Sequence, residues 1–154
     1  MAEYYADSSV LVKRHVPEAG TSWFRLLADP TSGNVIITAR VSVVEVYSAL
    51  NRRVREGTLD PKTYAALAAD FDSVCTAEYR LLELDPTVAA RACRLLEQHA
   101  LRAYDAVQLA TALIAKDLLV ASGLQGLTFL SADARLLSAA HAEGLAVNDP
   151  NAHP

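Results

Sequence analysis

The sequence predicts a three-layer α/β/α domain built on a central parallel sheet of four to five strands. Short β-prone segments alternate with longer helical patterns, and strands separated by helices pair in parallel through right-handed crossovers. The strand from Val35 to Thr38 has the unbroken apolar character of a sheet that is covered on both faces. The helix from Tyr104 to about Ala121 is rich in Ala, Leu, Val and Ile, which indicates a helix in the middle of the domain.

The first half of the chain predicts two strands and the helices that follow them. Glu3 to Asp7 is short and aromatic, as in a strand, and the serines after it are typical of a helix start. That helix should stop near Pro17, and the second strand occupies 35–38. Asp60 and Pro61 supply a cap and a first-turn proline for a further helix. The helices expected here are 9–15, 18–28, a long helix closed by a glycine after residue 56, and 61–79.

The second half alternates strands and helices in the same way. Tyr79 to Leu84 alternates partly between apolar and polar residues, which predicts a strand at the edge of the sheet. The elements expected after it are helix 86–99, helix 104–121, strand 126–130, helix 131–143 and, as the candidate fifth strand, 145–147. These elements form one domain over 1–147, and 148–154 is expected to be a loose C-terminal tail.

Composition narrows the class of protein. The 154 residues suffice for one domain with a real core. No apolar run approaches the ~20 residues of a membrane span, and the N-terminus lacks the pattern of a secretory signal, so we expect a cytoplasmic protein with no membrane partner. A net charge of −4 argues against a partner held mainly through phosphates, unless metal ions neutralise the acids. Cys75 and Cys93 lack metal-ligand spacing and are expected to be buried thiols.

Four carboxylates from distant segments are expected at one edge of the sheet. Asp7 closes the first strand, and Asp133 follows the fourth strand closely. Asp105 begins a helix that must run back toward the start of the fourth strand, so its N-terminus lies at the same edge. Glu45 is the only charged residue of its helix between two arginines, on a strip of small residues. Sites in open parallel sheets form at this edge, which is the carboxyl end of the strands.

Each acid also has a plain structural interpretation. Asp7 caps the following helix, and Asp105 and Asp133 complement the positive N-terminus of theirs. Glu45 closes a capping box with Ser42, since Ser-Val-Val-Glu fits that pattern. A fifth acid, at position 85, also follows a strand, but the proline after it explains it as a cap and it is left out of the site.

The four acids taken together predict a metal site. Carboxylates crowded within a few ångströms repel one another, and they are tolerated if they hold divalent cations or take up protons. Oxygen ligands without Cys or His favour Mg²⁺ or Mn²⁺ over Zn²⁺. Such ions generate hydroxide from bound water and stabilise the entering and leaving oxygens of a phosphodiester, so no protein nucleophile is required.

The motifs around these acids resemble those of PIN-domain ribonucleases, and most closely the VapC toxins of bacterial and archaeal toxin–antitoxin pairs. The resemblance covers almost the whole chain in the right order. The segments around the first, third and fourth acids carry it, and the helix of Glu45 is the least specific. These segments are Tyr-Ala-Asp-Ser-Ser-Val-Leu-Val-Lys at 5–13, Leu-Arg-Ala-Tyr-Asp-Ala-Val-Gln-Leu-Ala at 101–110 and Phe-Leu-Ser-Ala-Asp-Ala-Arg-Leu at 129–136.

The resemblance implies a PIN-like, Rossmann-like open sheet and a metal-dependent endoribonuclease that uses Mg²⁺ or Mn²⁺. The implied acidic quartet is Asp7, Glu45, Asp105 and Asp133. Two hydroxyls, those of Ser8 and Ser131, occupy positions that often help to place metal, water or phosphate in such enzymes. The resemblance further implies an RNA substrate, a homodimer and a cognate VapB-like antitoxin that covers the site. Gln108 stands where many relatives have His.

Alternatives remain open from the residues alone. Lys13 and Arg14 follow Asp7 within two helical turns and are candidates for contacts with RNA phosphates, although a solvated surface charge is the plainer interpretation. A non-catalytic PIN-fold protein that acts through interaction or nucleic-acid binding is the alternative function. A phosphorylation-controlled receiver domain would need adjacent acids after the first strand, and Asp7-Ser8 does not supply them. No glycine-rich phosphate-binding motif is present.

Overall fold

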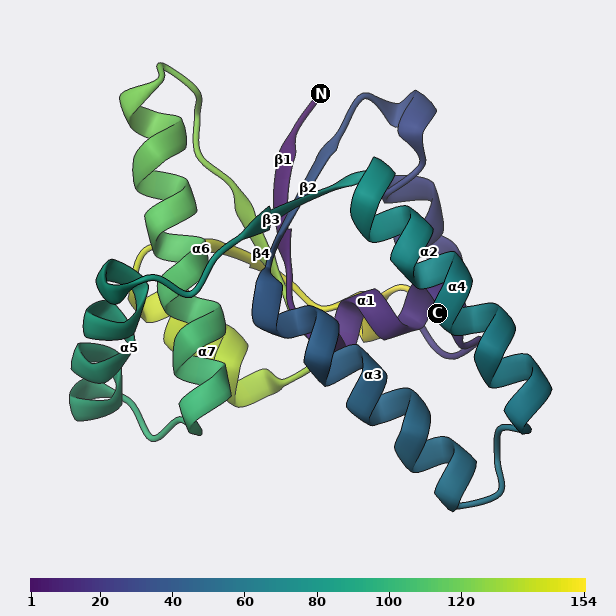
Figure 1. The fold of residues 1–154 in the computed structure, drawn as a ribbon. Coiled ribbons are helices and arrows are strands. Elements are labelled where there is room, and N and C mark those ends of the chain that lie inside the picture. The colour runs from purple at the N-terminus through teal and green to yellow at the C-terminus, as the bar shows by residue number, and fades with distance from the viewer.

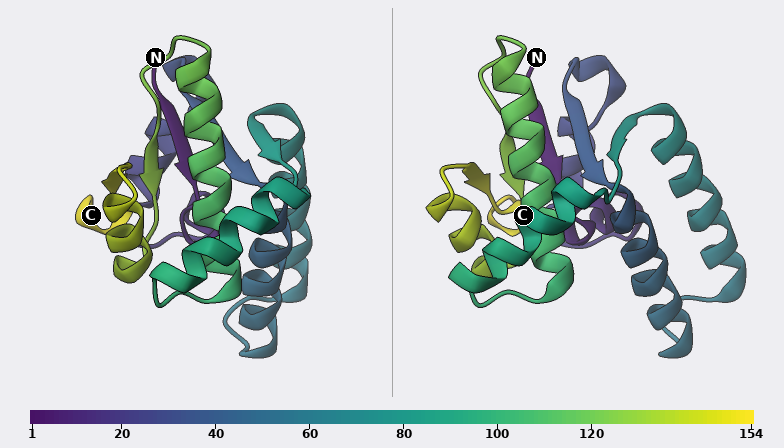
Figure 2. Two further views of the ribbon diagram at one scale, coloured as in Figure 1. Left: turned by 90° about the vertical axis from the view of Figure 1, so that its left-hand side faces the viewer. Right: turned by 60° about the vertical axis from the view of Figure 1, so that its left-hand side comes forward.

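A five-stranded parallel sheet in the order β3-β2-β1-β4-β5 lies between two layers of helices (Figures 1 and 2). The structure is a computed structural model that describes residues 1–154. The strands are β1 (Glu3–Ala6), β2 (Val35–Ala39), β3 (Tyr79–Leu82), β4 (Thr128–Leu130) and β5 (Ala146–Asn148). The helices are α1 (Ser8–His15), α2 (Thr21–Leu27), α3 (Arg40–Arg55), α4 (Pro61–Ala77), α5 (Pro86–Gln98), α6 (Ala103–Ala121) and α7 (Ala134–Ala142), with the short 3-10 helices η1 (Pro30–Ser32) and η2 (Pro150–Ala152).

The alternation of side chains along each strand divides the core into two parts. Tyr5 and Phe129 point to one face, where they pack with α5, α6 and α7. Their neighbours Ala6 and Leu130 point to the other face, where they pack with α1 to α4. The predicted three-layer architecture is confirmed, and so are the fifth strand and the edge position of β3.

The topology places the carboxyl end of β1 at the centre of the molecule. Strand β1 pairs with β2 on one side and with β4 on the other, so the connections leaving β1 and β4 diverge there. Figure 1 shows α1 and α3 beginning at this edge, with the N-terminal end of α6 on the same side. A switch of this kind in strand order opens the crevice in which α/β sheets bind ligands.

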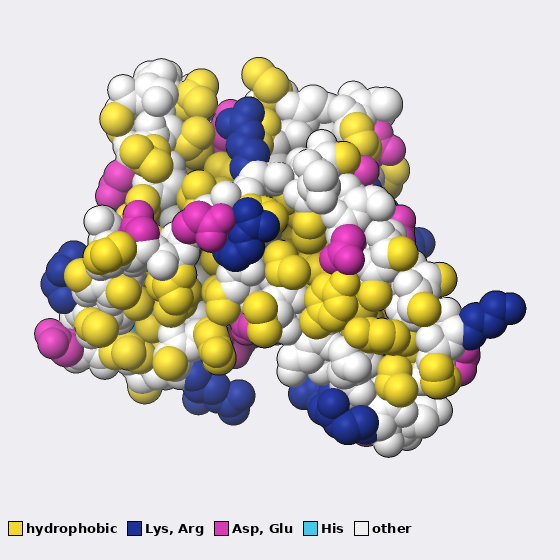
Figure 3. Space-filling model, in the orientation of Figure 1, with side chains coloured by type: hydrophobic (Ala, Val, Ile, Leu, Met, Phe, Trp, Pro, Cys, Tyr) yellow, Lys and Arg dark blue, Asp and Glu magenta, His cyan; other side chains and the backbone are white.

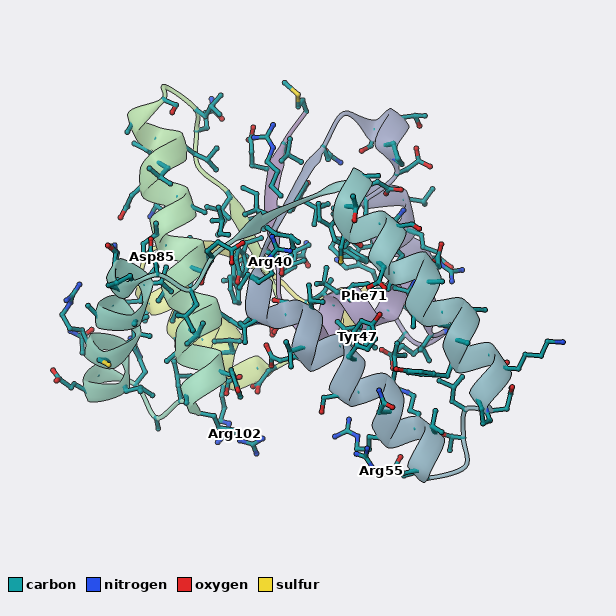
Figure 4. All side chains as sticks on the ribbon, in the orientation of Figure 1. Arg40, Tyr47, Arg55, Phe71, Asp85 and Arg102 are labelled. Carbon is teal, nitrogen blue, oxygen red and sulfur yellow. The ribbon has the colours of Figure 1, made fainter.

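Aspartates at helix starts explain why several helices begin where they do. Asp7, Asp60, Asp85 and Asp133 are N-caps whose carboxylates accept hydrogen bonds from backbone N–H groups of the first turn. The Asp85 carboxylate accepts one hydrogen bond, from the Val88 N–H at 2.8 Å, which agrees with its exclusion from the site. Figure 4 shows it beside α5, away from the lower ends of the central strands.

Two helix starts and the burial of one cysteine differ from the expectations. Helix α2 begins at Thr21 instead of residue 18, because Gly20 adopts a left-handed φ of 84° just before it. Helix α7 begins at residue 134, with Asp133 as its cap instead of a first-turn member. Cys93 is exposed, and only Cys75 is buried as expected. None of the helices combines the length and the apolar character needed to cross a bilayer.

The C-terminal segment is packed instead of loose. Pro150 is buried against Gly20, where an added Cβ would lie 2.4 Å from the Pro150 carbonyl oxygen. The ring of His153 stacks on Trp23 with centroids 4.3 Å apart. Asn151 accepts a 2.9 Å hydrogen bond from Lys13. The polar composition of 148–154 indicates a loose tail. The packing could not be predicted locally, because Lys13, Gly20 and Trp23 lie more than a hundred residues earlier in the chain.

Candidate active site

Asp7 is buried at the carboxyl end of β1 and is held by three hydrogen bonds. Its Oδ1 accepts from the Ser9 hydroxyl at 2.5 Å and from the Val10 N–H at 3.2 Å, and its Oδ2 accepts from the Ser131 hydroxyl at 2.6 Å. Burial raises the pKa of Asp7 to about 6, although these hydrogen bonds oppose the rise, and the charge of Glu45 adds to it. The predicted capping role is real, but it satisfies only one oxygen.

The loop after β4 brings Asp133 next to Asp7. The Ser131 hydroxyl that donates to Asp7 also accepts from the Asp133 N–H at 3.0 Å, so one oxygen atom joins the two acids. Asp133 Oδ1 accepts from the first backbone N–H groups of α7. Its Oδ2 accepts no hydrogen bond from the protein and is available to a ligand.

Glu45 is held by Gln108 across the interface of α3 and α6. Gln108 Nε2 donates to Glu45 Oε1 at 2.6 Å and to the Ser42 hydroxyl at 2.8 Å, while Gln108 Oε1 accepts from the Tyr5 hydroxyl at 2.5 Å. Burial raises the pKa of Glu45, hydrogen bonds from Gln108 and Ser8 lower it, and the charge of Asp105 raises it again. The capping-box interpretation of Glu45 is wrong, because α3 begins at Arg40 and Ser42 is not its cap.

Asp105 lies in the first turn of α6, where its Oδ2 accepts a long hydrogen bond of 3.4 Å from the Arg102 N–H. Its Oδ1 has no protein partner. Burial raises the pKa of Asp105, the Arg102 N–H lowers it, and the charge of Asp133 raises it. Asp105 thus complements the helix N-terminus, as one interpretation held, and still presents one oxygen.

The four acids form one electrostatic set. The charge of Glu45 raises the pKa of Asp7, that of Asp105 raises the pKa of Glu45, and that of Asp133 raises the pKa of Asp105. None of the four forms an ion pair with a lysine, arginine or histidine. The charges of Arg102 and Arg135 lower the pKa of Asp105 from a distance. The structure therefore gathers negative charge at the switch point of the sheet without a direct ion pair to balance it.

The donor set fits a hydrated hard cation. No three of the His, Cys, Asp and Glu side chains come close enough together to form a ready-made cage for an ion. Mg²⁺ does not need such a cage, because it keeps several waters and is held by one or two carboxylates together with substrate phosphates. The free oxygens of Asp105 and Asp133 match that mode of binding. The candidate ligand set contains no Cys or His, which also suits a hard cation.

The two serines contact the acids of the site, whereas the two basic residues proposed to bind RNA are engaged elsewhere. Ser131 positions two acids, and Ser8 lowers the pKa of Glu45 by a hydrogen bond. Lys13 is buried, with its ammonium bonded to Glu18, the Ala19 carbonyl and Asn151. The geometry does not support the expected contact with RNA for Lys13.

Arg14 likewise has a structural partner. Its guanidinium pairs with Glu78 at 2.5 Å and lies over the ring of Tyr79. The interpretation of Lys13 and Arg14 as solvated surface charges is also wrong, because both side chains are largely buried and paired with glutamates.

Sequence reasoning missed the buried polar network beneath the acids. The Ser42 hydroxyl accepts a 2.9 Å hydrogen bond from the Thr38 hydroxyl. The Thr38 hydroxyl oxygen also lies 2.7 Å from the Ala6 carbonyl oxygen, within hydrogen-bond distance. Together with Tyr5 and Gln108, these residues connect β1, β2, α3 and α6. The signal in the sequence is Gln108 itself, a polar residue within an otherwise apolar helix.

Comparison with known proteins identifies the family and the fold. The family model described as PIN domain matches residues 4–142. Ribonuclease VapC45 of Mycobacterium tuberculosis is 35% identical over 143 residues, which cover 93% of this chain and 92% of the relative.

Solved structures share the fold at lower identity. Mycobacterium tuberculosis VapC20, a sarcin–ricin loop cleaving toxin, has a TM-score of 0.61 and 17% identity and covers 98% of this chain and 99% of its own. VapBC2 from Rickettsia felis, solved bound to a DNA fragment from its promoter, has a TM-score of 0.57 and 12% identity, with 96% and 98% covered. With the matched family model and the VapC45 identity, these findings show that the chain belongs to the PIN-domain family.

Proposed function

We propose that this chain is a metal-dependent endoribonuclease and the toxin of a toxin–antitoxin pair. The observation that carries the proposal is the set of four carboxylates at the switch point of the sheet, whose charges raise the pKa values of Asp7, Glu45 and Asp105 and which form no direct ion pair. The name of the relative at 35% identity, a VapC ribonuclease, supports RNA as the substrate. We place its action in the cytoplasm, where RNA is accessible.

In this proposal Mg²⁺ or Mn²⁺ is held by Asp105 and Asp133 through their unpartnered oxygens, with Asp7 and Glu45 completing the negative pocket. When bound, such an ion supplies an acidified water and charge stabilisation for a phosphodiester. The protein supplies orientation. Ser131 fixes Asp7 relative to Asp133, and Gln108 fixes the Glu45 carboxylate from below.

The partners follow from the same reasoning. A toxin–antitoxin complex from Klebsiella pneumoniae has a similar fold, with a TM-score of 0.54, which supports a VapB-like antitoxin as the partner of this chain. We also propose a homodimer, since exposed apolar side chains such as Leu84 and Leu118 remain on the surface of the isolated chain.

The test is cleavage of total RNA in the presence of Mn²⁺ by the parent protein, Asp7→Asn and Asp105→Asn. The matched control is Asp85→Asn, which alters another helix-capping aspartate outside the site. We expect cleavage by the parent and the control and none by the two site variants. Absence of cleavage by the parent, together with no Mn²⁺ binding in calorimetry, would favour a non-catalytic PIN-fold interaction protein instead.

A further inference from the structure

A groove of about 610 Å³ leads away from the acids along α3. Ser8, Glu45 and Ala132 line the end next to the acids, and Ser48 and Arg52 continue the same face of α3. Glu45 and Arg52 are seven residues apart, so they lie roughly 10 Å apart along the helix axis. Figure 3 shows the surface hollowed between the lower ends of α6 and α3, with Lys or Arg side chains on both sides of the hollow.

Arg52 is the free cation of this groove. Lys13 and Arg53 also line it, but Glu18 pairs with both, at 3.2 Å and 3.8 Å. Arg52 is exposed and forms no ion pair. A guanidinium with its donors unengaged at the end of a groove is suited to bind an anionic oxygen pair such as that of a phosphate.

Tyr104 provides an aromatic surface at the other end. It lines the groove directly before Asp105, and 57% of its surface is exposed. The chain has few aromatic residues, and most of them are at least partly buried, so an exposed tyrosine here is not explained by packing. Aromatic rings beside a nucleic-acid path serve as stacking surfaces for bases.

We propose that this groove binds a short single-stranded RNA segment, with a base stacked on Tyr104 and a phosphate held by Arg52. The proposal rests on the proposed ribonuclease function and adds the path of the substrate. Of the four acids, Glu45 lines the groove, Tyr104 directly precedes Asp105, and Arg52 lies about two helical turns beyond Glu45 on α3, so a strand with one phosphate at Glu45 can place another at Arg52. A volume of about 610 Å³ lies in the range of pockets that take small ligands, which gives room for a short unpaired segment.

The experiment measures binding of a short fluorescent oligoribonucleotide by anisotropy in Ca²⁺ over a series of salt concentrations, with gels to verify that the RNA stays intact. Arg52→Ala is compared with Arg55→Ala, which removes an exposed arginine from the same last turn outside the groove (Figure 4). Tyr104→Ala is compared with Tyr104→Phe, which keeps the ring. Thermal unfolding of each variant verifies that the fold is intact.

We expect Arg52→Ala to make the dependence of log affinity on log salt shallower by about 0.7, the value for one phosphate contact on a single strand. Arg55→Ala should match the parent. Tyr104→Ala should weaken binding about fivefold or more, as expected for the loss of one stacked base, while Tyr104→Phe retains it.

Two results would overturn this assignment: equal behaviour of Arg52→Ala and Arg55→Ala, or equal weakening by Tyr104→Ala and Tyr104→Phe. Unchanged RNA binding by both Arg52→Ala and Tyr104→Ala would assign the groove to a protein partner instead. Because binding is measured without turnover, this test can fail while the parent still cleaves RNA, and the two failures remain distinguishable.

Discussion

The buried charge of Asp7 should lower the unfolding free energy of the metal-free protein. The variant Asp7→Asn measures this loss of stability. Burial raises the pKa of Asp7 from 3.8 to about 6. A difference of that size between the unfolded and folded states corresponds to about 3 kcal/mol at neutral pH. Asn caps a helix as well as Asp does. The 3 kcal/mol already compares ionised Asp7 with its neutral form, so Asn loses in addition only a hydrogen bond between neutral groups from Ser131, which costs about 1 kcal/mol. The net expectation is a gain of about 2 kcal/mol in unfolding free energy.

The direction of the pH dependence follows from the raised pKa. Between the unfolded value of 3.8 and the folded value of about 6, the folded protein keeps a proton on Asp7 that the unfolded chain has lost. Stability contributed by this group therefore falls as the pH rises through that window, and the full cost is present above it. At a pH below the window the charge cost is absent and the lost hydrogen bond remains, so Asp7→Asn should be less stable than the parent by about 1 kcal/mol.

The assay is urea unfolding in EDTA at neutral pH and at a pH below that window, with Asp85→Asn as the matched control. Asp85 has the same capping role at an exposed helix start, so its replacement by Asn should leave stability unchanged. Addition of Mn²⁺ should stabilise the parent and reduce the advantage of Asp7→Asn, because the cation compensates the charge that the variant removes. A variant less stable than the parent at neutral pH in EDTA would refute the reasoning.

Two further predictions concern the supports of the site. Gln108→Leu removes the donor to Glu45 and leaves buried polar groups unpaired, so the unfolding free energy should fall by about 2 kcal/mol or more. The affinity for Mn²⁺, measured by calorimetry, should fall as well. An unchanged affinity would mean that Glu45 does not need the hydrogen bond from Gln108. Gly20→Ala should release the C-terminal segment, because the new Cβ overlaps Pro150, and limited proteolysis should then cut that segment. Gly33→Ala, at a similar φ in open space, should cost only the ~1 kcal/mol of left-handed strain and leave the segment protected.

The sequence by itself determined the order of elements and the acidic ends of the helices. Alternating strand and helix patterns fix a parallel sheet, and caps such as Asp7 and Asp85 are read from local sequence because they act within one turn. The same locality explains the errors. Nothing near Lys13 in the sequence indicates that Glu18 and Asn151 engage it, and nothing near residue 150 indicates Gly20 as its contact.

Tertiary structure decided which side chains remain free. Gln108 reads as an interruption in an apolar helix until α3 is packed against it, and it then holds Glu45, Ser42 and Tyr5 together. Burial and mutual charge, which raise the pKa values of the acids, also arise only when distant segments meet. Local patterns specify backbone geometry because their interactions span one turn, whereas solvation and pairing of a side chain depend on neighbours that the fold alone brings into contact.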